Sequence, residues 1–416
     1  MTLSISIVRV PMKNFPFVVF MAALLFAGLG WPQRHVFCAS DAPISKVLAL
    51  PNASLLMEEN GRVRISRHAD RPMVPASTMK ILTALASIQR WGMGHRFHTD
   101  FFGAGDGRLW VKGGGDPYLV SEELDRIVAT LKRKGIRSVN GLGLDDSLFS
   151  PRQWIAGRSS SNNPYDAPVT AIAVNFNTIS LIKKEGKLYS GESQTPLTAI
   201  AARFGARLGP GKHRVNLENR ETSVLYFGEL LAAKLSKAGI PVHGDIRIGR
   251  MPAGARFIYR HANSHDLRQI LASMLEYSNN FIANELFLLL ARQGDRGGLD
   301  MEQARRVANI WARKNFGWSS YRIEDGAGLS RGNRLSARQL LDVVMAFKPY
   351  MALLPEYKDR VRAKTGTLKG VSCYAGFVKR QGGWQPFSLL INQSVPHGLR
   401  KQVADALART PDLAIY

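Results

Sequence analysis

Apolar positions recur with a helical period directly after Pro75. Those on one face of this predicted helix are Ile81, Leu82, Leu85 and Ile88. Because proline is favoured at a helix start, we expect Ser77 in the first turn, in the positive field of the helix N-terminus. Similar apolar patterns predict further helices at 122–134, 223–238 and 267–291, and a closing helix marked by Leu399, Val403 and Leu407.

Strand patterns occupy both ends of the chain. Residues 47–65 are expected to form two strands joined at Asn60-Gly61, a strong hairpin turn signal. Residues 371–378 and 387–391 are predicted strands on either side of the turn at Gly382-Gly383. Strands at both ends with helices between them indicate an α+β fold with one antiparallel sheet built from both termini.

The middle of the chain has a different character. From about residue 99 short strands alternate with glycine-rich turns, and a strand at 141–144 ends at Asp145. We therefore interpret 99–264 as an inserted domain between two parts of a main domain, 41–98 and 265–416. Within the insertion, residues 178–218 are polar and turn-rich, which predicts a reduced inner insertion without a clear core.

The first 40 residues carry no acid, and Arg9 and Lys13 precede an apolar run at 15–29. This pattern is typical of a secretory signal peptide, and its apolar core is short for a membrane span. An uncleaved anchor is the alternative. We expect an exported protein of the periplasm or cell envelope. Cys373 is then the only certain cysteine, and its strand position favours a packed thiol without a disulfide.

The composition is strongly basic. Without the first 40 residues, which hold three basic and no acidic side chains, the net charge falls from +24 to +21. Such a surface attracts polyanions. Anionic membrane lipids or acidic wall polymers are the expected partners. Nucleic acid is not expected, because an exported chain rarely meets it and no nucleic-acid-binding module is recognisable. A solvated basic surface without a partner is the alternative.

Ser77 and Lys80 are the first candidate catalytic pair. Three residues apart on a helix, they share one face, so the lysine amine can reach the serine hydroxyl. A serine is a weak nucleophile until a neighbouring base takes its proton. A second Ser-x-x-Lys match, Ser180 to Lys183, lies in a predicted strand, where positions i and i+3 face opposite sides. Only the first pair therefore has the required backbone.

Two further motifs accompany this pair. Ser278-Asn279-Asn280 falls within the predicted helix 267–291, and Lys364-Thr365-Gly366-Thr367 precedes the C-terminal strands. The order Ser-x-x-Lys, Ser-x-Asn, Lys-Thr-Gly is typical of the penicillin-recognising serine enzymes.

These residues resemble the D-alanyl-D-alanine carboxypeptidase/endopeptidase family of low-molecular-mass penicillin-binding proteins, the DacB type. The resemblance extends over nearly all of the chain after the leader, including 114–117, 144–149 and 325–331. It implies a serine DD-peptidase/β-lactamase-like catalytic domain, an antiparallel sheet flanked by helices, interrupted by an inserted α/β domain. The chain departs from the family in its short segments 178–218 and 354–362, and in Ala327, where serine is common.

The resemblance also implies residue roles. Ser77 would attack the carbonyl between the two D-alanines of a peptidoglycan stem peptide, and Lys80 would take its proton. Burial and the charge of Lys364 should keep Lys80 neutral. Ser278 would relay the proton to the leaving amine, and Asn280 would orient Lys80 and bind the substrate amide.

Other roles concern binding. The backbone N–H groups of Ser77 and Thr367 would form the oxyanion hole, while Lys364, Thr365, Gly366 and Thr367 would bind the terminal carboxylate. Asp145 would contact the free amine of the diamino acid in the stem peptide, although an aspartate that caps a turn at a strand end explains it equally well. No metal or organic cofactor is expected.

The resemblance predicts that β-lactams inhibit the protein by acylating Ser77. Two other functions remain open. A β-lactamase or esterase on the same fold would keep the nucleophile and release β-lactams quickly. A non-catalytic wall-binding protein would keep the fold and lose acylation.

Overall fold

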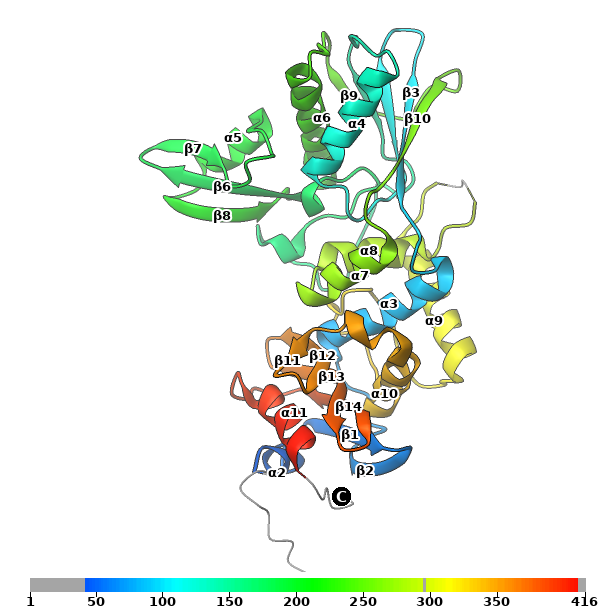
Figure 1. Cartoon of the computed structure of the whole chain (residues 1–416), viewed down its shortest axis with the longest axis vertical. Coiled ribbons are helices and arrows are strands. Elements are labelled where there is room, and N and C mark those ends of the chain that lie inside the picture. The colour runs from blue at the N-terminus through cyan, green and yellow to red at the C-terminus, as the bar shows by residue number, and fades with distance from the viewer. Residues whose placement is uncertain (1–41, 295–296, 411–416) are drawn as a thin grey trace, which may run out of the picture.

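The computed structural model describes residues 42–294 and 297–410, which form two bodies along the long axis of the molecule (Figure 1). The predicted signal peptide, residues 1–40, lies outside the described residues. No helix in these ranges has the length and apolar character needed to cross a membrane.

The first body is built on a six-stranded antiparallel sheet with the order β11-β12-β13-β14-β1-β2. Its strands are β1 (Ala53–Glu59), β2 (Arg62–Arg67), β11 (Glu356–Tyr357), β12 (Val361–Leu368), β13 (Val371–Arg380) and β14 (Gly383–Ile391). Strand β1 pairs with β14, with Ala53 opposite Ile391, which confirms a sheet assembled from both ends of the chain.

Helices cover both faces of this sheet. One face packs against α2 (Ala42–Leu48) and α11 (Leu399–Arg409). The other packs against a helical layer of α3 (Met79–Trp91), α7 (Leu267–Glu276), α8 (Asn280–Leu289), α9 (Met301–Phe316) and α10 (Ala337–Ala346). Residues 47–48, predicted to begin a strand, end helix α2 instead, because Ile44 and Val47 pack together on the sheet. Cys373 is fully buried in the shared core, as predicted, and its Sγ donates to the carbonyl of Val74.

The second body is built on a five-stranded mixed sheet with the order β10-β3-β4-β5-β9. Its strands are β3 (His98–Gly103), β4 (Leu109–Gly113), β5 (Leu142–Asp145), β9 (Ile246–Ile248) and β10 (Arg256–Ala262). Helices α4 (Ser121–Arg133) and α6 (Arg220–Lys237) share its core. These elements lie between β3 and β10 in the chain, where the inserted domain was expected, and the domain boundaries themselves stay a prediction.

A small three-stranded sheet projects sideways from the second body (Figure 1). It consists of β6 (Thr178–Lys184), β7 (Lys187–Ser190) and β8 (Gly211–Asn216) with helix α5 (Ala199–Ala206). The short turns η3 (Pro164–Asp166) and η4 (Asn175–Asn177) lead into it. The prediction that residues 178–218 have no clear core is wrong. Their apolar side chains belong to the core of the second body, among them Ile179, Ile200, Phe204 and Val215.

The predicted long helix 267–291 is wrong. The structure divides it into α7 and α8 at Tyr277–Asn279. Ser278 adopts a left-handed backbone conformation with φ of 53°, which a continuous helix does not allow. The Asn279 side chain then accepts a hydrogen bond from the N–H of Ile282 at 3.1 Å and begins α8. Apolar periodicity concealed the break because both helices bury the same side in one core.

Candidate active site

Ser77 lies in a single 3₁₀ turn, η2 (Ala76–Thr78), immediately before α3 begins at Met79. The preceding residue, Ala76, has φ of 48°, a conformation that a residue with a β-carbon adopts only when its surroundings enforce it. Lys80, one turn further on, places its Nζ 2.9 Å from Ser77 Oγ. The structure thus brings together the pair that the spacing predicts.

Lys80 is fully buried and has three polar partners. Its Nζ lies 2.9 Å from Ser77 Oγ, and it donates to Asn280 Oδ1 at 2.7 Å and to the carbonyl of Ala327 at 2.8 Å. Burial, and then the charge of Lys364, lower the pKa of Lys80 well below 10.5, against the opposing effect of Asp325. The amine therefore loses its proton far more readily than an ordinary lysine, as a general base must.

The carbonyl of Ala327 is held in place by a buried aspartate. Asp325 Oδ1 accepts from the backbone N–H groups of Ala327 at 2.8 Å and Gly328 at 2.6 Å, and Oδ2 accepts from Ser330 N–H at 2.8 Å. Asn284, on α8, adds a contact to Ala327 N–H at 3.2 Å. No sequence motif predicted a catalytic role for this loop. Its only signal in the sequence is the stretch 325–331 within the family resemblance.

Asn280 joins the two bodies at the site. Its Oδ1 accepts from Lys80, and its Nδ2 donates to the carbonyl of Tyr165 in η3 at 3.1 Å. These two contacts determine which way the amide points. Ser278 and Asn280 both line a cavity of about 480 Å³. Within the described ranges, the Ser278 hydroxyl makes no hydrogen bond to Lys80, so its part in proton transfer stays a prediction.

The Lys364-Thr365-Gly366-Thr367 motif lies on strand β12, beside the Ser77 turn. A β-carbon on Gly366 would come within 2.7 Å of the carbonyl of Pro75 and 3.1 Å of Ser77 N, so only glycine allows this approach. Lys364 is 1% exposed. Burial, and then the charge of Arg400, lower its pKa to about 8, while Glu276 opposes the shift. Strand β12 therefore places a second lysine with a lowered pKa near the nucleophile.

Arg400, on α11, is a site residue that motif analysis missed. Its Nη1 donates to the carbonyl of Gly366 and to Thr367 Oγ1, both at 2.7 Å. It adds positive charge where the Lys-Thr-Gly strand would bind a carboxylate. No sequence signal identifies it, because it stands outside every motif and reaches the site only through the packing of α11 on the sheet.

Asp145 ends strand β5 and is 5% exposed. Its Oδ1 accepts from Ser147 N–H at 3.0 Å, and its Oδ2 accepts from Met251 N–H at 2.9 Å. This is the arrangement of an aspartate that caps a turn. Both carboxylate oxygens of Asp145 thus cap backbone N–H groups, and its contact with the substrate stays a prediction.

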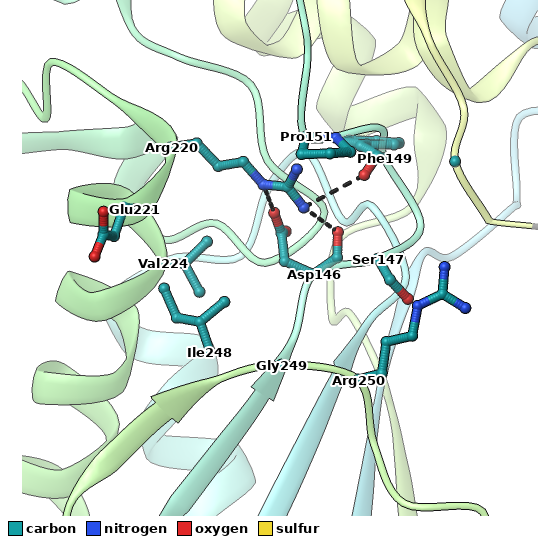
Figure 2. Close-up of a pocket in the computed structure, with 11 residues that line it drawn as sticks. Asp146, Ser147, Phe149, Pro151, Arg220, Glu221, Val224, Ile248, Gly249 and Arg250 are labelled. Carbon is teal, nitrogen blue, oxygen red and sulfur yellow. Dashed lines mark hydrogen bonds and ion pairs between the residues drawn. The ribbon is translucent and has the colours of Figure 1, made fainter.

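A cavity of about 510 Å³ lies near this strand end (Figure 2), and none of the predicted catalytic residues lines it. At its edge Arg220 Nε pairs with Asp146 Oδ2 at 2.5 Å. Burial raises the pKa of Asp146 to about 6 despite this ion pair. No cluster of three or more His, Cys, Asp or Glu side chains within residues 42–294 and 297–410 is placed to hold a metal ion.

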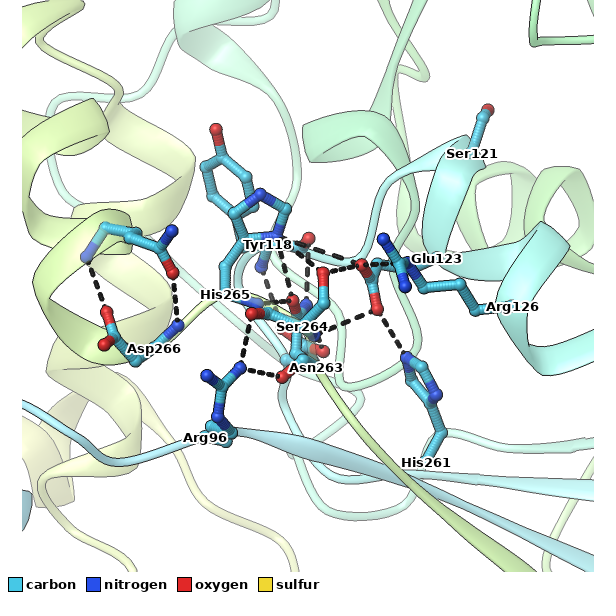
Figure 3. Close-up of polar contacts among 12 residues, drawn as sticks. Arg96, Tyr118, Ser121, Glu123, Arg126, His261, Asn263, Ser264, His265 and Asp266 are labelled. Carbon is cyan, nitrogen blue, oxygen red and sulfur yellow. Dashed lines mark hydrogen bonds and ion pairs between the residues drawn. The ribbon is translucent and has the colours of Figure 1, made fainter. Parts of the chain in front are cut away.

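A polar network joins the second body to the start of α7 (Figure 3). Glu123 accepts from His261 Nε2 at 2.7 Å and from the N–H of Ser264 at 3.1 Å. Burial alone would raise the pKa of Glu123, but the hydrogen bonds from His261 and Ser264 lower it to about 2. The network therefore holds a charged carboxylate that ties α4 to the chain leading into the catalytic helices.

Comparisons with known proteins agree with this geometry. The D-Ala-D-Ala carboxypeptidase 3 (S13) family matches residues 54–202, 212–355 and 351–410. The D-alanyl-D-alanine carboxypeptidase of Actinomadura sp. (strain R39) is 25% identical over 89% of this chain and 81% of that protein. D-alanyl-D-alanine carboxypeptidase DacB of Haemophilus influenzae is 25% identical over 75% of this chain and 78% of its own length.

Solved structures show the same fold. The crystal structure of penicillin binding protein 4 (dacB) from Haemophilus influenzae has a TM-score of 0.72 and 21% identity, and covers 89% of this chain and 98% of that one. The structure of that protein complexed with a novel β-lactam has a TM-score of 0.66 and the same identity and coverage. The predicted fold, a serine DD-peptidase catalytic domain interrupted by an insertion, is thereby confirmed.

Proposed function

Because the chain belongs to the D-Ala-D-Ala carboxypeptidase 3 (S13) family, we propose that it hydrolyses the D-Ala-D-Ala bond of peptidoglycan stem peptides through an acyl-enzyme on Ser77. One observation carries this assignment. The buried Nζ of Lys80 lies 2.9 Å from Ser77 Oγ while Asn280 and the carbonyl of Ala327 hold it from the other side.

Acylation begins at the Ser77 hydroxyl. The neutral amine of Lys80 takes the proton as Oγ bonds to the carbonyl carbon of the penultimate D-alanine. The bond from that carbon to nitrogen then breaks, and the proton passes to the leaving amine through the Ser278 hydroxyl. Water hydrolyses the ester and restores Ser77. The lowered pKa of Lys80 supports its part, because burial and the charge of Lys364 make the free base more accessible than in an ordinary lysine.

The strand β12 supplies the binding groups. The N–H groups of Ser77 and Thr367 stabilise the oxyanion, and one such donor contributes about 3 kcal/mol to lowering the barrier. Lys364, Thr365 and Thr367 bind the terminal carboxylate, with Gly366 allowing the strand to approach the nucleophile. The charge of Arg400 supports this assignment, since it donates to Gly366 and Thr367 beside the same place.

A fluorescent penicillin tests the acyl-enzyme directly. A β-lactam presents the same scissile amide, acylates Ser77 and leaves slowly, so stable labelling is expected. Ser77→Ala should abolish it, and Ser180→Ala is the matched control, because it removes the serine of the second Ser-x-x-Lys match on β6. Rapid loss of the label would indicate a β-lactamase or esterase, and absence of labelling would indicate a non-catalytic wall-binding protein.

The same chemistry would also open cross-links when the leaving amine belongs to a diamino acid. Chromatography of muropeptides released from purified cell walls measures this endopeptidase activity against the carboxypeptidase activity. We also place the protein in the cell envelope, where peptidoglycan lies. Its net charge of +21 without the first 40 residues suits contact with anionic lipids or acidic wall polymers.

A further inference from the structure

The cavity of about 510 Å³ in the second body lies away from the catalytic residues (Figure 2). It opens where the parallel strands β5 and β9 end, beside the start of α6. Crevices at the carboxyl ends of parallel strands are common binding places in α/β folds, and this volume is in the range of ligand-binding sites. None of its lining residues takes part in the proposed acylation, so its occupant follows from the chemistry of the cavity itself.

Apolar side chains form much of the cavity wall, namely those of Phe149, Val224 and Ile248. Phe149 and Val224 are almost fully buried, whereas Ile248, the last residue of β9, is 42% exposed. A ligand group that covers Ile248 and enters the cavity removes this apolar surface from water, which is favourable. The wall therefore favours an apolar group in the ligand.

Two arginines line the cavity, and only one of them has a partner. Arg220 pairs with Asp146 at 2.5 Å and donates to the carbonyl of Phe149 at 3.3 Å. Arg250 is exposed and has neither an ion pair nor a hydrogen bond with any of the described residues. Glu221, the exposed acid of the cavity, lies on the opposite side from Arg250 (Figure 2). The Arg250 side of the cavity therefore offers a free positive charge, which favours a carboxylate in the ligand.

Strand β9 is the last strand of its sheet, so one of its edges has no neighbouring strand among the described residues. The N–H of Gly249 donates to the carbonyl of Leu144 on β5 at 3.0 Å. Because backbone groups alternate in direction along an extended strand, those of Ile248 and Arg250 point to the free edge. An acyl chain in the cavity would leave these groups unpaired, whereas a peptide backbone would pair them. A charged, very short edge strand usually resists pairing, but this one has an apolar side chain and a cavity beside its edge.

We propose that the free edge of β9 and the adjoining cavity bind an extended segment of a partner protein, which adds to the sheet as a further strand. Alternate side chains of a strand share one face, and Ile248 and Arg250 both line the cavity. The added strand places an apolar side chain against Ile248 and Val224 and, two residues further, an aspartate or glutamate against Arg250. The ligand is thus an acidic peptide with this spacing, and the inference does not depend on the peptidase activity.

The probe is a short fluorescent peptide with both ends blocked, Thr-Thr-Leu-Thr-Glu-Thr-Thr, titrated with the whole protein and followed by fluorescence anisotropy. The wild-type protein should bind this peptide better than one with lysine in place of glutamate. Arg250→Glu should weaken binding of the glutamate peptide by roughly three- to tenfold, because an attractive cross-strand pair becomes a repulsive one. The same variant should prefer the lysine peptide. A purely structural role of Arg250 would not reverse the preference.

Arg256→Glu is the matched control. Arg256 is an exposed arginine at the start of β10, which forms the opposite edge of the same sheet. This variant has the same net charge as Arg250→Glu and should keep the wild-type preference for the glutamate peptide. Melting temperatures of both variants show whether a weaker affinity reflects loss of folding instead.

N-methylation of the peptide tests the backbone pairing. The N–H groups of an added strand point alternately toward β9 and away from it, so a methyl group on the leucine nitrogen or on that of the next threonine should abolish binding in one case only. Absence of peptide binding, equal effects of the two methyl groups, or an unchanged preference in Arg250→Glu would overturn the proposal. Binding of dodecanoate without binding of the peptide would also overturn it and make the cavity a fatty-acid site.

Discussion

The proton on Lys364 should set the alkaline limit of activity. This lysine is 1% exposed, and burial together with the charge of Arg400 lowers its pKa to about 8. The ammonium is the group that would bind the terminal carboxylate of the substrate. As pH rises through 8, the lysine loses its charge, so kcat/KM should fall.

The size of the effect follows from the titration. With a pKa of about 8, roughly nine-tenths of Lys364 is charged at pH 7 and roughly one-eleventh at pH 9, so kcat/KM should drop about tenfold between them. Arg400→Gln removes a like charge beside Lys364. The pKa should then rise toward 10.5, and the fall in kcat/KM should begin at a higher pH.

The assay is the pH profile of kcat/KM for release of D-alanine from a free pentapeptide. Lys401→Gln is the matched control, because Lys401 is a neighbouring cation on α11 whose side chain lies over the ring of Tyr357. It should leave the profile in place. Because Arg400 also contacts the Lys-Thr-Gly strand, the absolute rate of the Arg400→Gln variant can change. The prediction is therefore tested only by the pH at which kcat/KM begins to fall. An unshifted limb in Arg400→Gln would refute the assignment to Lys364.

Three further predictions concern single buried groups. Lys80→Arg should slow penicillin labelling by at least about 10²-fold, because a guanidinium stays protonated and cannot act as the base; labelling at the wild-type rate would contradict this role. Burial raises the pKa of Glu285 well above 4.5. Neither carboxyl oxygen of Glu285 has a hydrogen-bond partner among the described residues. Its folded state therefore keeps a proton that the unfolded state releases, and the free energy of unfolding should fall by about 1.4 kcal/mol per pH unit above pH 4.5. Glu285→Gln should remove this slope in urea titrations, and parallel slopes in the two proteins would exclude it. Asp145→Asn should cost about 1–3 kcal/mol of stability, because an amide NH₂ would face a backbone N–H. The Asp145→Asn variant should lose the same activity on peptides with and without a free side-chain amine. A loss confined to peptides with the amine would support the contact between Asp145 and the substrate.

The catalytic residues were easier to predict from the sequence than the backbone conformation that positions them. Ser77 and Lys80 are close in sequence, and a helical period alone places them on one face. The break at Ser278 was missed because burial pattern does not report a left-handed residue between two helices that share a core. Arg400 was missed because its contact with Gly366 depends on how α11 packs, which no local pattern records.

The small three-stranded sheet was underestimated for a related reason. Its strands are short and carry polar outer faces, so the sequence shows more turns than apolar residues. Its buried residues, Ile179, Phe204 and Val215 among them, join the core of a neighbouring body and need no separate one. The sheet topology of the main domain was predictable because both ends of the chain carry unambiguous strand patterns.

The pairing of β1 with β14 has a consequence for the order of assembly. Strand β1, which precedes Ser77, cannot pair with its central neighbour β14 until residues near 391 have been synthesised. The second body, made from the intervening residues, can fold while it waits. Since β12 flanks the nucleophile and also comes late in the chain, the active site can form only after nearly the whole chain has been synthesised. A truncated product that lacks β12 and β14 therefore carries no assembled active site.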